Sequence, residues 1–148
     1  MSIRRSAHAV YDCQYHLVWC PKYRKAVMQG AVASRLRALF YEIGYAYDIA
    51  IEEMEVASDH VHLFCAFPPR LSIVQVVTRL KSLSARAIFA EFPQVKRQLW
   101  GGEFWEDSYF ARTVGEQVTA EIIRRYIARH RSPPGRPPDM QPPLFDEP

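Results

Sequence analysis

Two histidines inside an apolar stretch are the residues of this chain best suited to chemistry. His60 and His62 flank Val61 within a run that extends from Val56 to Phe67. If that run is a β-strand, both imidazoles lie on one face, because strand side chains alternate with a period of two. Two convergent imidazoles on a rigid strand would form half of a divalent-metal site. Two half-buried histidines on a solvated sheet face would have the same spacing, so the pair alone leaves both interpretations open.

A tyrosine and a histidine near the C-terminus extend the metal hypothesis. Tyr126 and His130 are four residues apart, so on a helix they share a face with Cβ atoms about 5–6 Å apart. Considered singly, Tyr126 is better explained by packing, and His130 by solvation near a helix C-terminus. Together with the histidine pair they indicate a metal ion bound by all three histidines beside the phenol. Such an ion would act as a Lewis acid on a phosphate oxygen while the phenol oxygen attacks phosphorus.

The apolar pattern predicts the elements that must position these groups. Alternating or continuous apolar runs predict strands, and apolar residues at helical spacing predict helices. The expected strands cover residues 11–20, 49–57, 60–67 and 104–114, and the expected helices cover about 32–43, 72–92 and 116–130. Gly44 is expected to end the first helix. Ser72 and Gln75 form a capping box that begins the second helix, and Pro93 is expected to end it.

The resulting order is β-α-β-β-α-β followed by a helix. It predicts an α+β fold of the ferredoxin-like plan, an antiparallel sheet with an additional C-terminal helix that carries the nucleophile. In that plan the first and third strands lie in the middle of the sheet, and both preceding helices cover one face. The histidine pair is therefore expected on a central strand, facing away from those helices. The last helix is the expected cover for the open face, and it would bring Tyr126 over the pair.

Composition divides the chain into a body and a tail. The 148 residues suffice for one domain with a real core. Residues 132–148 contain seven of the eleven prolines and a net charge of −2, so we expect a proline-rich disordered tail after a body of residues 1–131. The whole chain carries +3, so the body carries about +5. That bias suits a polyanionic partner, although an ordinary solvated basic face would give it too.

Cysteine usage and hydropathy indicate the compartment. Cys13, Cys20 and Cys65 are odd in number, lack C-x-x-C spacing and fall in apolar runs, which is typical of reduced thiols in a cytoplasmic protein. No apolar segment follows the basic N-terminus, so no secretory signal is expected, and no run is long enough to span a membrane.

Four segments together resemble the single-tyrosine HUH transposases, which are small enzymes of bacterial and archaeal insertion sequences that move as single-stranded DNA. The segments are YHLVWCPKYR at residues 15–24, DHVHL at 59–63, LWGG at 99–102 and RYI at 125–127. The resemblance covers about residues 9–131, which is essentially the whole body and would make it the catalytic domain. The combination is specific, although His-x-His alone is not.

The resemblance implies an activity, a cofactor and partners. A homodimer would bind imperfect hairpins at the element ends and cleave single-stranded DNA, with Tyr126 joined to the 5′ phosphate and a 3′ hydroxyl left free to rejoin. His60 and His62 would hold a divalent metal, Mg²⁺ or Mn²⁺. The family commonly has glutamine four residues after the tyrosine, where this chain has His130. Three imidazole ligands would favour manganese or another transition ion over magnesium more than the usual pattern does.

Further residues are candidates for DNA contact. Basic residues cluster in the first loop and on the long second helix, where they could contact phosphates, and one tyrosine between them could stack on a base. These residues are Lys22, Tyr23, Arg24, Lys25, Arg79, Lys81 and Arg86. A generic solvated surface explains each of them nearly as well. His16, on the neighbouring central strand, could support the metal ligands or could simply be a strand histidine satisfied by backbone or water.

Other functional classes remain open from the sequence. A related or domesticated HUH endonuclease acting on genomic repeat hairpins would use the same residues. A non-catalytic ferredoxin-like nucleic-acid-binding domain would need aromatic residues on the third strand, where this chain has His60 and His62. A phosphoesterase using metal-bound water would need the metal but not Tyr126.

Overall fold

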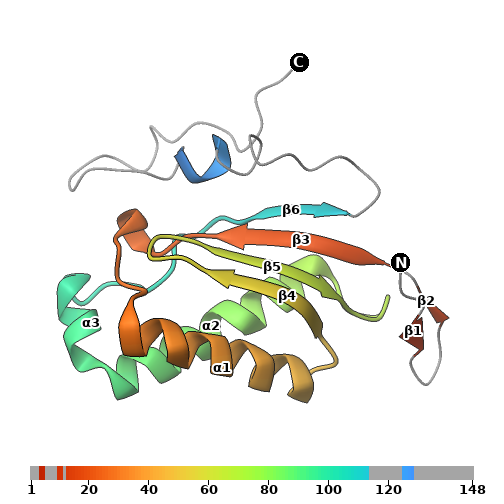
Figure 1. Ribbon diagram of the computed structural model, residues 1–148, viewed down its shortest axis with the longest axis horizontal. Helices are drawn as coiled ribbons and strands as arrows, with labels where there is room; N and C mark the ends of the chain where they lie inside the picture. The colour runs from red at the N-terminus through yellow and green to blue at the C-terminus, as the bar shows by residue number, and fades with distance from the viewer. Residues whose placement is uncertain (1–3, 6–9, 12, 114–124, 129–148) are drawn as a thin grey trace.

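A four-stranded antiparallel sheet forms the centre of the computed structural model, which describes residues 4–5, 10–11, 13–113 and 125–128 (Figure 1). The strands are β1 (Arg4–Arg5), β2 (Val10–Tyr11), β3 (Gln14–Trp19), β4 (Ala50–Val56), β5 (Val61–Ala66) and β6 (Phe110–Thr113). The helices are the 3₁₀ helix η1 (Lys22–Arg24), α1 (Gly30–Ala46), α2 (Ile73–Glu91) and α3 (Pro93–Gln98). β1 and β2 form a separate small hairpin.

The sheet has the order β4-β5-β3-β6, and every neighbouring pair is antiparallel. β3 and β5 therefore occupy the middle, and α1 and α2 both lie on one face (Figure 1). This arrangement confirms the predicted ferredoxin-like fold. No helix in the described part of the chain is both long and apolar enough to cross a membrane.

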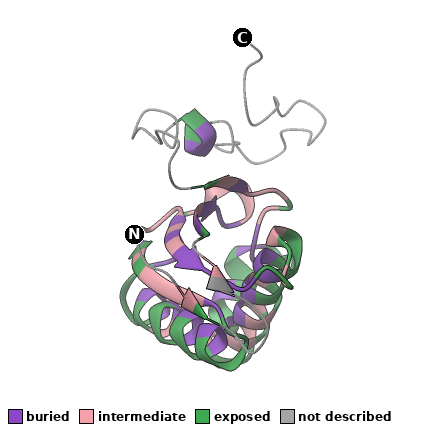
Figure 2. Cartoon of the chain, turned by 90° about the vertical axis from the view of Figure 1, so that its right-hand side faces the viewer, coloured by how far each residue is buried: buried purple, intermediate pink, exposed green. Residues whose placement is uncertain are grey.

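Side-chain alternation gives the central strands two different faces. Leu17 and Trp19 on β3, with Val61 and Leu63 on β5, belong to the main core that the helices cover, and Phe40 of α1 packs edge-on against Trp19. The purple buried residues in Figure 2 lie mainly between the sheet and these helices. A fully buried indole or phenylalanine ring removes about 150–250 Å² from water, so this face anchors the sheet.

The opposite face has a smaller cover. Val18, Cys20 and Phe110 on that face contact Tyr126 and Ile127, which belong to a short helical segment at 125–128. That segment is the part of the expected final helix that the structure describes, and it lies across the sheet from α1 and α2 (Figure 1). The rest of the expected helix, His130 and the expected tail fall outside the described residues.

Several predicted boundaries require correction. The first strand is shorter than expected and begins at Gln14. β6 begins only at Phe110, because Phe104 and Trp105 are buried in an irregular segment. That segment hydrogen-bonds the loop after β3 through Lys22 N to Phe104 O (2.8 Å). Pro93 does more than follow α2, since it occupies the first turn of α3, where its missing N–H has no cost.

The predicted start of α2 is confirmed, whereas the predicted end of α1 is wrong. The Ser72–Gln75 capping box at the start of α2 is confirmed by reciprocal hydrogen bonds of 3.0 and 2.9 Å. Gly44 lies inside α1 and does not end it. A Cβ atom at Gly44 would come within 2.5 Å of the Ile49 carbonyl oxygen, so the residue allows the chain leading into β4 to approach the helix closely.

Gly44→Ala should therefore destabilise the protein although alanine favours helices. Overpacking against fixed backbone costs about 1–3 kcal/mol, which exceeds the roughly 1 kcal/mol gained in helix propensity. We expect the melting temperature to fall by several degrees. Ser34→Ala, at an exposed position of the same helix, is the matched control and should be neutral or slightly stabilising. A Gly44→Ala protein at least as stable as the parent would refute the close-approach explanation.

Candidate active site

Two imidazoles meet on the sheet face opposite α1 and α2. On β5, His62 is paired with Val18 of β3 and Glu55 of β4. His16 on β3 points to the same face, and its Nδ1 atom lies 2.8 Å from His62 Nε2 in a hydrogen bond. Burial lowers the pKa of both histidines, and for His62 the neighbouring His16 lowers it further. Both rings therefore favour the neutral form, which is the form that binds metals.

His60 is oriented by the residue before it. Its Nδ1 atom lies 3.1 Å from Asp59 Oδ1. Burial alone would raise the pKa of Asp59, but hydrogen bonds from His60 and Arg24 outweigh burial and leave that pKa below its ordinary value. An ionised carboxylate can only accept, so His60 donates from Nδ1 and, when neutral, keeps the lone pair of Nε2 for a metal.

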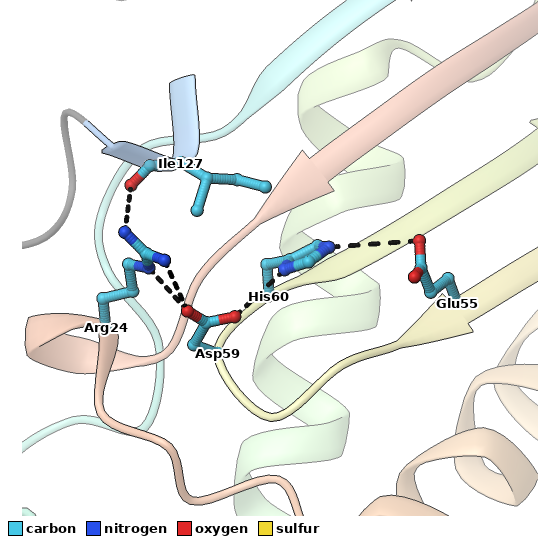
Figure 3. Close-up of polar contacts among 5 residues, drawn as sticks. All are labelled: Arg24, Glu55, Asp59, His60 and Ile127. Carbon is cyan, nitrogen blue, oxygen red and sulfur yellow. Dashed lines mark hydrogen bonds and ion pairs between the residues drawn. The ribbon is translucent and has the colours of Figure 1, made fainter. Parts of the chain in front are cut away.

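Arg24 connects this histidine to the C-terminal segment (Figure 3). Its Nε and Nη2 atoms both lie 2.7 Å from Asp59 Oδ2, and its side chain is only 11% exposed. Its Nη1 atom donates to the carbonyl oxygen of Ile127 at 3.4 Å. One guanidinium thus contacts both the carboxylate that orients His60 and the residue that follows Tyr126. A lysine could not replace it, because an ammonium group lacks the planar fork.

Carboxylates of the neighbouring edge strand border the same site. Glu55 Oε1 lies 4.0 Å from His60 Nε2, and a hollow of about 130 Å³ beside His62 is lined by Glu53, Met54, Glu55, His62 and Phe64. Sequence reasoning missed Asp59, Glu53 and Glu55. The parity of the hairpin between β4 and β5 was the available signal, because it places Glu55 opposite His62.

Tyr126 lies deep under the 125–128 segment. Its side chain is 1% exposed and its ring centroid is 5.9 Å from that of Phe110. Burial raises the pKa of the phenol, and the Cys20 thiol and Glu106 carboxylate add to the increase, while a hydrogen bond with Ser108 opposes it. None of these neighbours is a histidine. In this position the phenol is protonated rather than activated as a nucleophile.

The described residues do not form the predicted metal site on their own. No three histidine, cysteine or acidic side chains there converge closely enough to hold an ion. His60 and His62 could supply two nitrogen ligands. His130, the expected third ligand, lies outside the described residues.

The expected DNA-contact residues fall into two separate groups. Lys22, Tyr23, Arg24 and Lys25 form the η1 loop beside the histidine site. The remaining three lie on α2, which covers the other face of the sheet (Figure 1). There, Arg79 stacks over Tyr47 at 4.3 Å, and Arg86 is exposed.

Lys81 on α2 already has an internal role. Its ammonium group donates to the carbonyl oxygens of Glu106 and Ser108. Burial lowers its pKa, and nearby carboxylates, Asp107 first, oppose that change. Lys81 therefore holds the segment before β6 in place. A lysine that contacts DNA phosphates would instead have its ammonium group in solvent.

Comparisons with known proteins agree with this architecture. A family model described as "Transposase IS200 like" matches residues 9–130. The ISDra2 transposase TnpA of Deinococcus radiodurans is 38% identical over 130 residues, which cover 88% of this chain and 93% of that protein. The transposase for insertion sequence element IS200 of Salmonella typhimurium is 30% identical over 116 residues, 78% of this chain and 76% of that protein.

Two solved structures are also similar. A putative transposase from Deinococcus radiodurans superposes with a TM-score of 0.80 at 35% identity, covering 88% of this chain and 99% of that one. A REP-associated tyrosine transposase bound to a REP hairpin has a TM-score of 0.52 at 12% identity, covering 86% of this chain and 70% of that one, which is a likeness of fold alone. Since the family model and both transposase relatives match most of its length, this chain belongs to the IS200-like transposase family, as its motifs predicted.

Proposed function

We propose that this transposase cleaves and rejoins single-stranded DNA at hairpin-bearing ends through a covalent bond between Tyr126 and a 5′ phosphate, with a divalent metal ion at His60 and His62. The observation that carries the proposal is the oriented histidine: His60 donates a hydrogen bond from Nδ1–H to the Asp59 carboxylate, which leaves the lone pair of Nε2 for a metal. The REP hairpin bound to the REP-associated tyrosine transposase supports hairpin recognition as part of the same proposal.

The donor set suits a small divalent cation. His60 and His62 supply nitrogen, and we propose His130 as the third protein ligand. The Glu55 carboxylate, whose Oε1 atom lies 4.0 Å from His60 Nε2, borders the site and is not counted among the ligands. Imidazole nitrogens together with an oxygen of the bound phosphate fit Mn²⁺, and Mg²⁺ less well. The bound ion would polarise a phosphate oxygen and stabilise the charge that develops on it. Burial lowers the pKa of His62, which favours the neutral, metal-binding form of this imidazole near neutral pH.

The chain itself must supply and move the nucleophile. The Tyr126 phenol, with its pKa raised by burial near Cys20 and Ser108, has to approach the histidines before it can lose its proton and attack. Arg24 lies between the two groups, because it contacts both Asp59 and the Ile127 carbonyl. Attack would form the phosphotyrosine bond and release a 3′ hydroxyl. Reversal by another 3′ hydroxyl would need no nucleotide cofactor, because the covalent bond conserves the energy.

The leading alternative is a related or domesticated endonuclease that acts on genomic repeat hairpins with the same chemistry. DNA flanking the gene discriminates the two, because subterminal hairpins on both sides indicate a mobile element. A non-catalytic binding domain is less well supported, because His62 occupies a strand position where such a domain presents a stacking aromatic. The three free cysteines, two of them buried, support a cytoplasmic location.

The first test is covalency. Tyr126→Phe should reduce cleavage of single-stranded element-end DNA by at least ~10³-fold and abolish the protein–DNA adduct, because only the phenol oxygen is lost. Hairpin binding should stay nearly intact. Tyr109→Phe, just before β6, is the matched control and should retain the adduct. Peptide mapping of the adduct by mass spectrometry identifies the residue, and an adduct elsewhere, or cleavage without one, would disprove the assignment.

The second test is the metal site. His60→Ala and His62→Ala should abolish both Mn²⁺ binding and cleavage while the protein stays folded. Asp59→Asn should weaken Mn²⁺ binding by about 10–100-fold, because the amide no longer orients His60 as an ionised acceptor does. Asp48→Asn, at an exposed carboxylate near the end of α1, is the control. Calorimetric titration without DNA measures each dissociation constant, and undiminished Mn²⁺ binding by the histidine variants would place the metal elsewhere.

The same titration examines the third ligand. His130→Gln should retain cleavage but shift the metal preference toward Mg²⁺, because an amide oxygen replaces a nitrogen. An unchanged Mn²⁺-to-Mg²⁺ preference would mean that His130 is not a ligand.

The third test concerns assembly. One tyrosine per chain can hold one cut end, whereas excision handles two, so we propose a homodimer with two sites. If each site pairs Tyr126 of one chain with the histidines of the other, mixing Tyr126→Phe chains with His60→Ala/His62→Ala chains restores one intact site per mixed dimer. Cleavage should then return to about a quarter to half of the parental rate, on the order expected for one site in a mixed population. Co-purified mixed dimers that stay inactive would show that each chain completes its own site.

A further inference from the structure

Two aromatic side chains meet at the tips of two loops beside the histidine site. Tyr23 in η1 and Trp100 after α3 have ring centroids 5.3 Å apart and planes inclined at 59°. Trp100 is 59% exposed, whereas Trp19 and Trp105 are 0% and 4% exposed. A single exposed aromatic residue is ordinary, so exposure gains meaning only from the features around it.

The backbone under both rings is held in an uncommon conformation. Tyr23, Arg24 and Trp100 have φ angles of 60°, 50° and 56°, in the left-handed region that residues with side chains rarely adopt. Hydrogen bonds maintain it. The Tyr23 N–H donates to the Glu106 carboxylate at 2.8 Å, and the N–H of Gly101 donates to the Lys96 carbonyl at 2.9 Å. Backbone strain of this kind is concentrated at functional sites, and here it holds the exposed Trp100 ring against the half-buried Tyr23 ring.

The charges around the rings suit a polyanion. The Lys25 ammonium lies 4.4 Å from the Trp100 ring centroid and donates to the Gln98 carbonyl at 2.8 Å. The same two chain segments carry further basic residues, Lys22, Lys96 and Arg97. The acidic residues nearby in sequence are Glu103, Glu106 and Asp107. Glu106 accepts from the Tyr23 N–H, and Asp107 acts on the Lys81 ammonium. A ligand with a flat aromatic part and linked phosphates matches this mixture better than an apolar protein segment does.

The aromatic pair is connected directly to the candidate active site. Arg24 follows Tyr23 and bonds Asp59, which in turn bonds His60 (Figure 3). Adjacent Cα atoms are about 3.8 Å apart, so the backbone of Tyr23 lies next to the residue that contacts Asp59. A DNA strand with a phosphate at the histidines would therefore pass close to the two rings.

We propose that Tyr23 and Trp100 form a stacking platform for an unpaired base of the DNA strand bound at the histidine site, with Lys25 and its basic neighbours meeting the adjacent phosphates. The proposal rests on the proposed function in taking single-stranded DNA as the ligand, and it adds where one base of that strand lies. Stacking of this kind tolerates any base, because every base has a π face.

The tryptophan distribution provides the experiment. In a Tyr126→Phe background with chelator present, no cleavage interferes, and oligothymidylate of about twelve nucleotides serves as the probe. Because the other two tryptophans are buried, saturable quenching of intrinsic fluorescence reports contact at Trp100. Anisotropy of a labelled probe gives the dissociation constant for variants that lack this signal.

The expected results separate stacking from folding. Trp100→Ala should weaken oligothymidylate binding by roughly 5- to 150-fold, the range that one stacked base contributes, and Tyr23→Ala should weaken it less. Trp100→Phe keeps an aromatic face and should restore most of the affinity, which a merely misfolded variant would not do. Tyr45→Ala, at a 92% exposed aromatic of α1 on the other face, should change nothing.

Contrary results are equally clear. Normal probe binding by Trp100→Ala, or no quenching while the parent binds, would overturn the platform and leave the proposed function standing. No binding of oligothymidylate by the parent would also overturn the platform, because stacking that tolerates any base needs no hairpin. Failure of the proposed function itself would show instead as the absence of a Tyr126 adduct with hairpin-bearing DNA. A Trp100→Ala chain that changes its oligomeric state in size-exclusion chromatography, with unchanged affinity, would assign the patch to contact between copies and overturn the stacking proposal.

Discussion

The antiparallel pairing of β3 with β5 is the constraint on which the site depends. Its register sets His62 opposite Val18 and His16 opposite Phe64, so the two imidazoles come within hydrogen-bond distance. The same register sends Leu63 into the core. A slip of one residue would exchange the two faces, exposing the apolar set and burying the histidines. Burial of apolar side chains on the helix-covered face therefore fixes the positions of His16 and His62 on the opposite face.

The sheet could be predicted from sequence because its signals are local and agree with one another. Period-two alternation around His62 identified the central strand and its outward face, and the Ser72–Gln75 motif located the start of α2. β6 was overestimated because apolar Phe104 and Trp105 resemble strand residues. Both residues are buried in an irregular segment whose backbone hydrogen-bonds to the loop after β3, far away in the sequence. Contacts of this kind leave no periodic pattern in the sequence.

The supporting groups of the site could not be predicted for a related reason. Arg24 reaches Asp59 only because the backbone turns left-handed at Tyr23 and Arg24, and no residue type there demands that conformation. The surroundings of Tyr126 follow from how a C-terminal segment packs on Phe110 and Cys20, which is a tertiary choice. Sequence thus singled out the side chains that we propose to be reactive, while their protonation states depend on contacts between segments distant along the chain.

The order of elements along the chain also separates the two halves of the proposed chemistry in time. The groups on the histidine side all lie within the first 62 residues: His16, Arg24, Asp59, His60 and His62. Tyr126 follows 64 residues after His62. Ribosomes add roughly 5–20 residues per second, so the histidine half emerges some ~3–13 s before the tyrosine does. During synthesis the nascent chain can pair β3 with β5 and bring the candidate metal ligands together before the proposed nucleophile has been added.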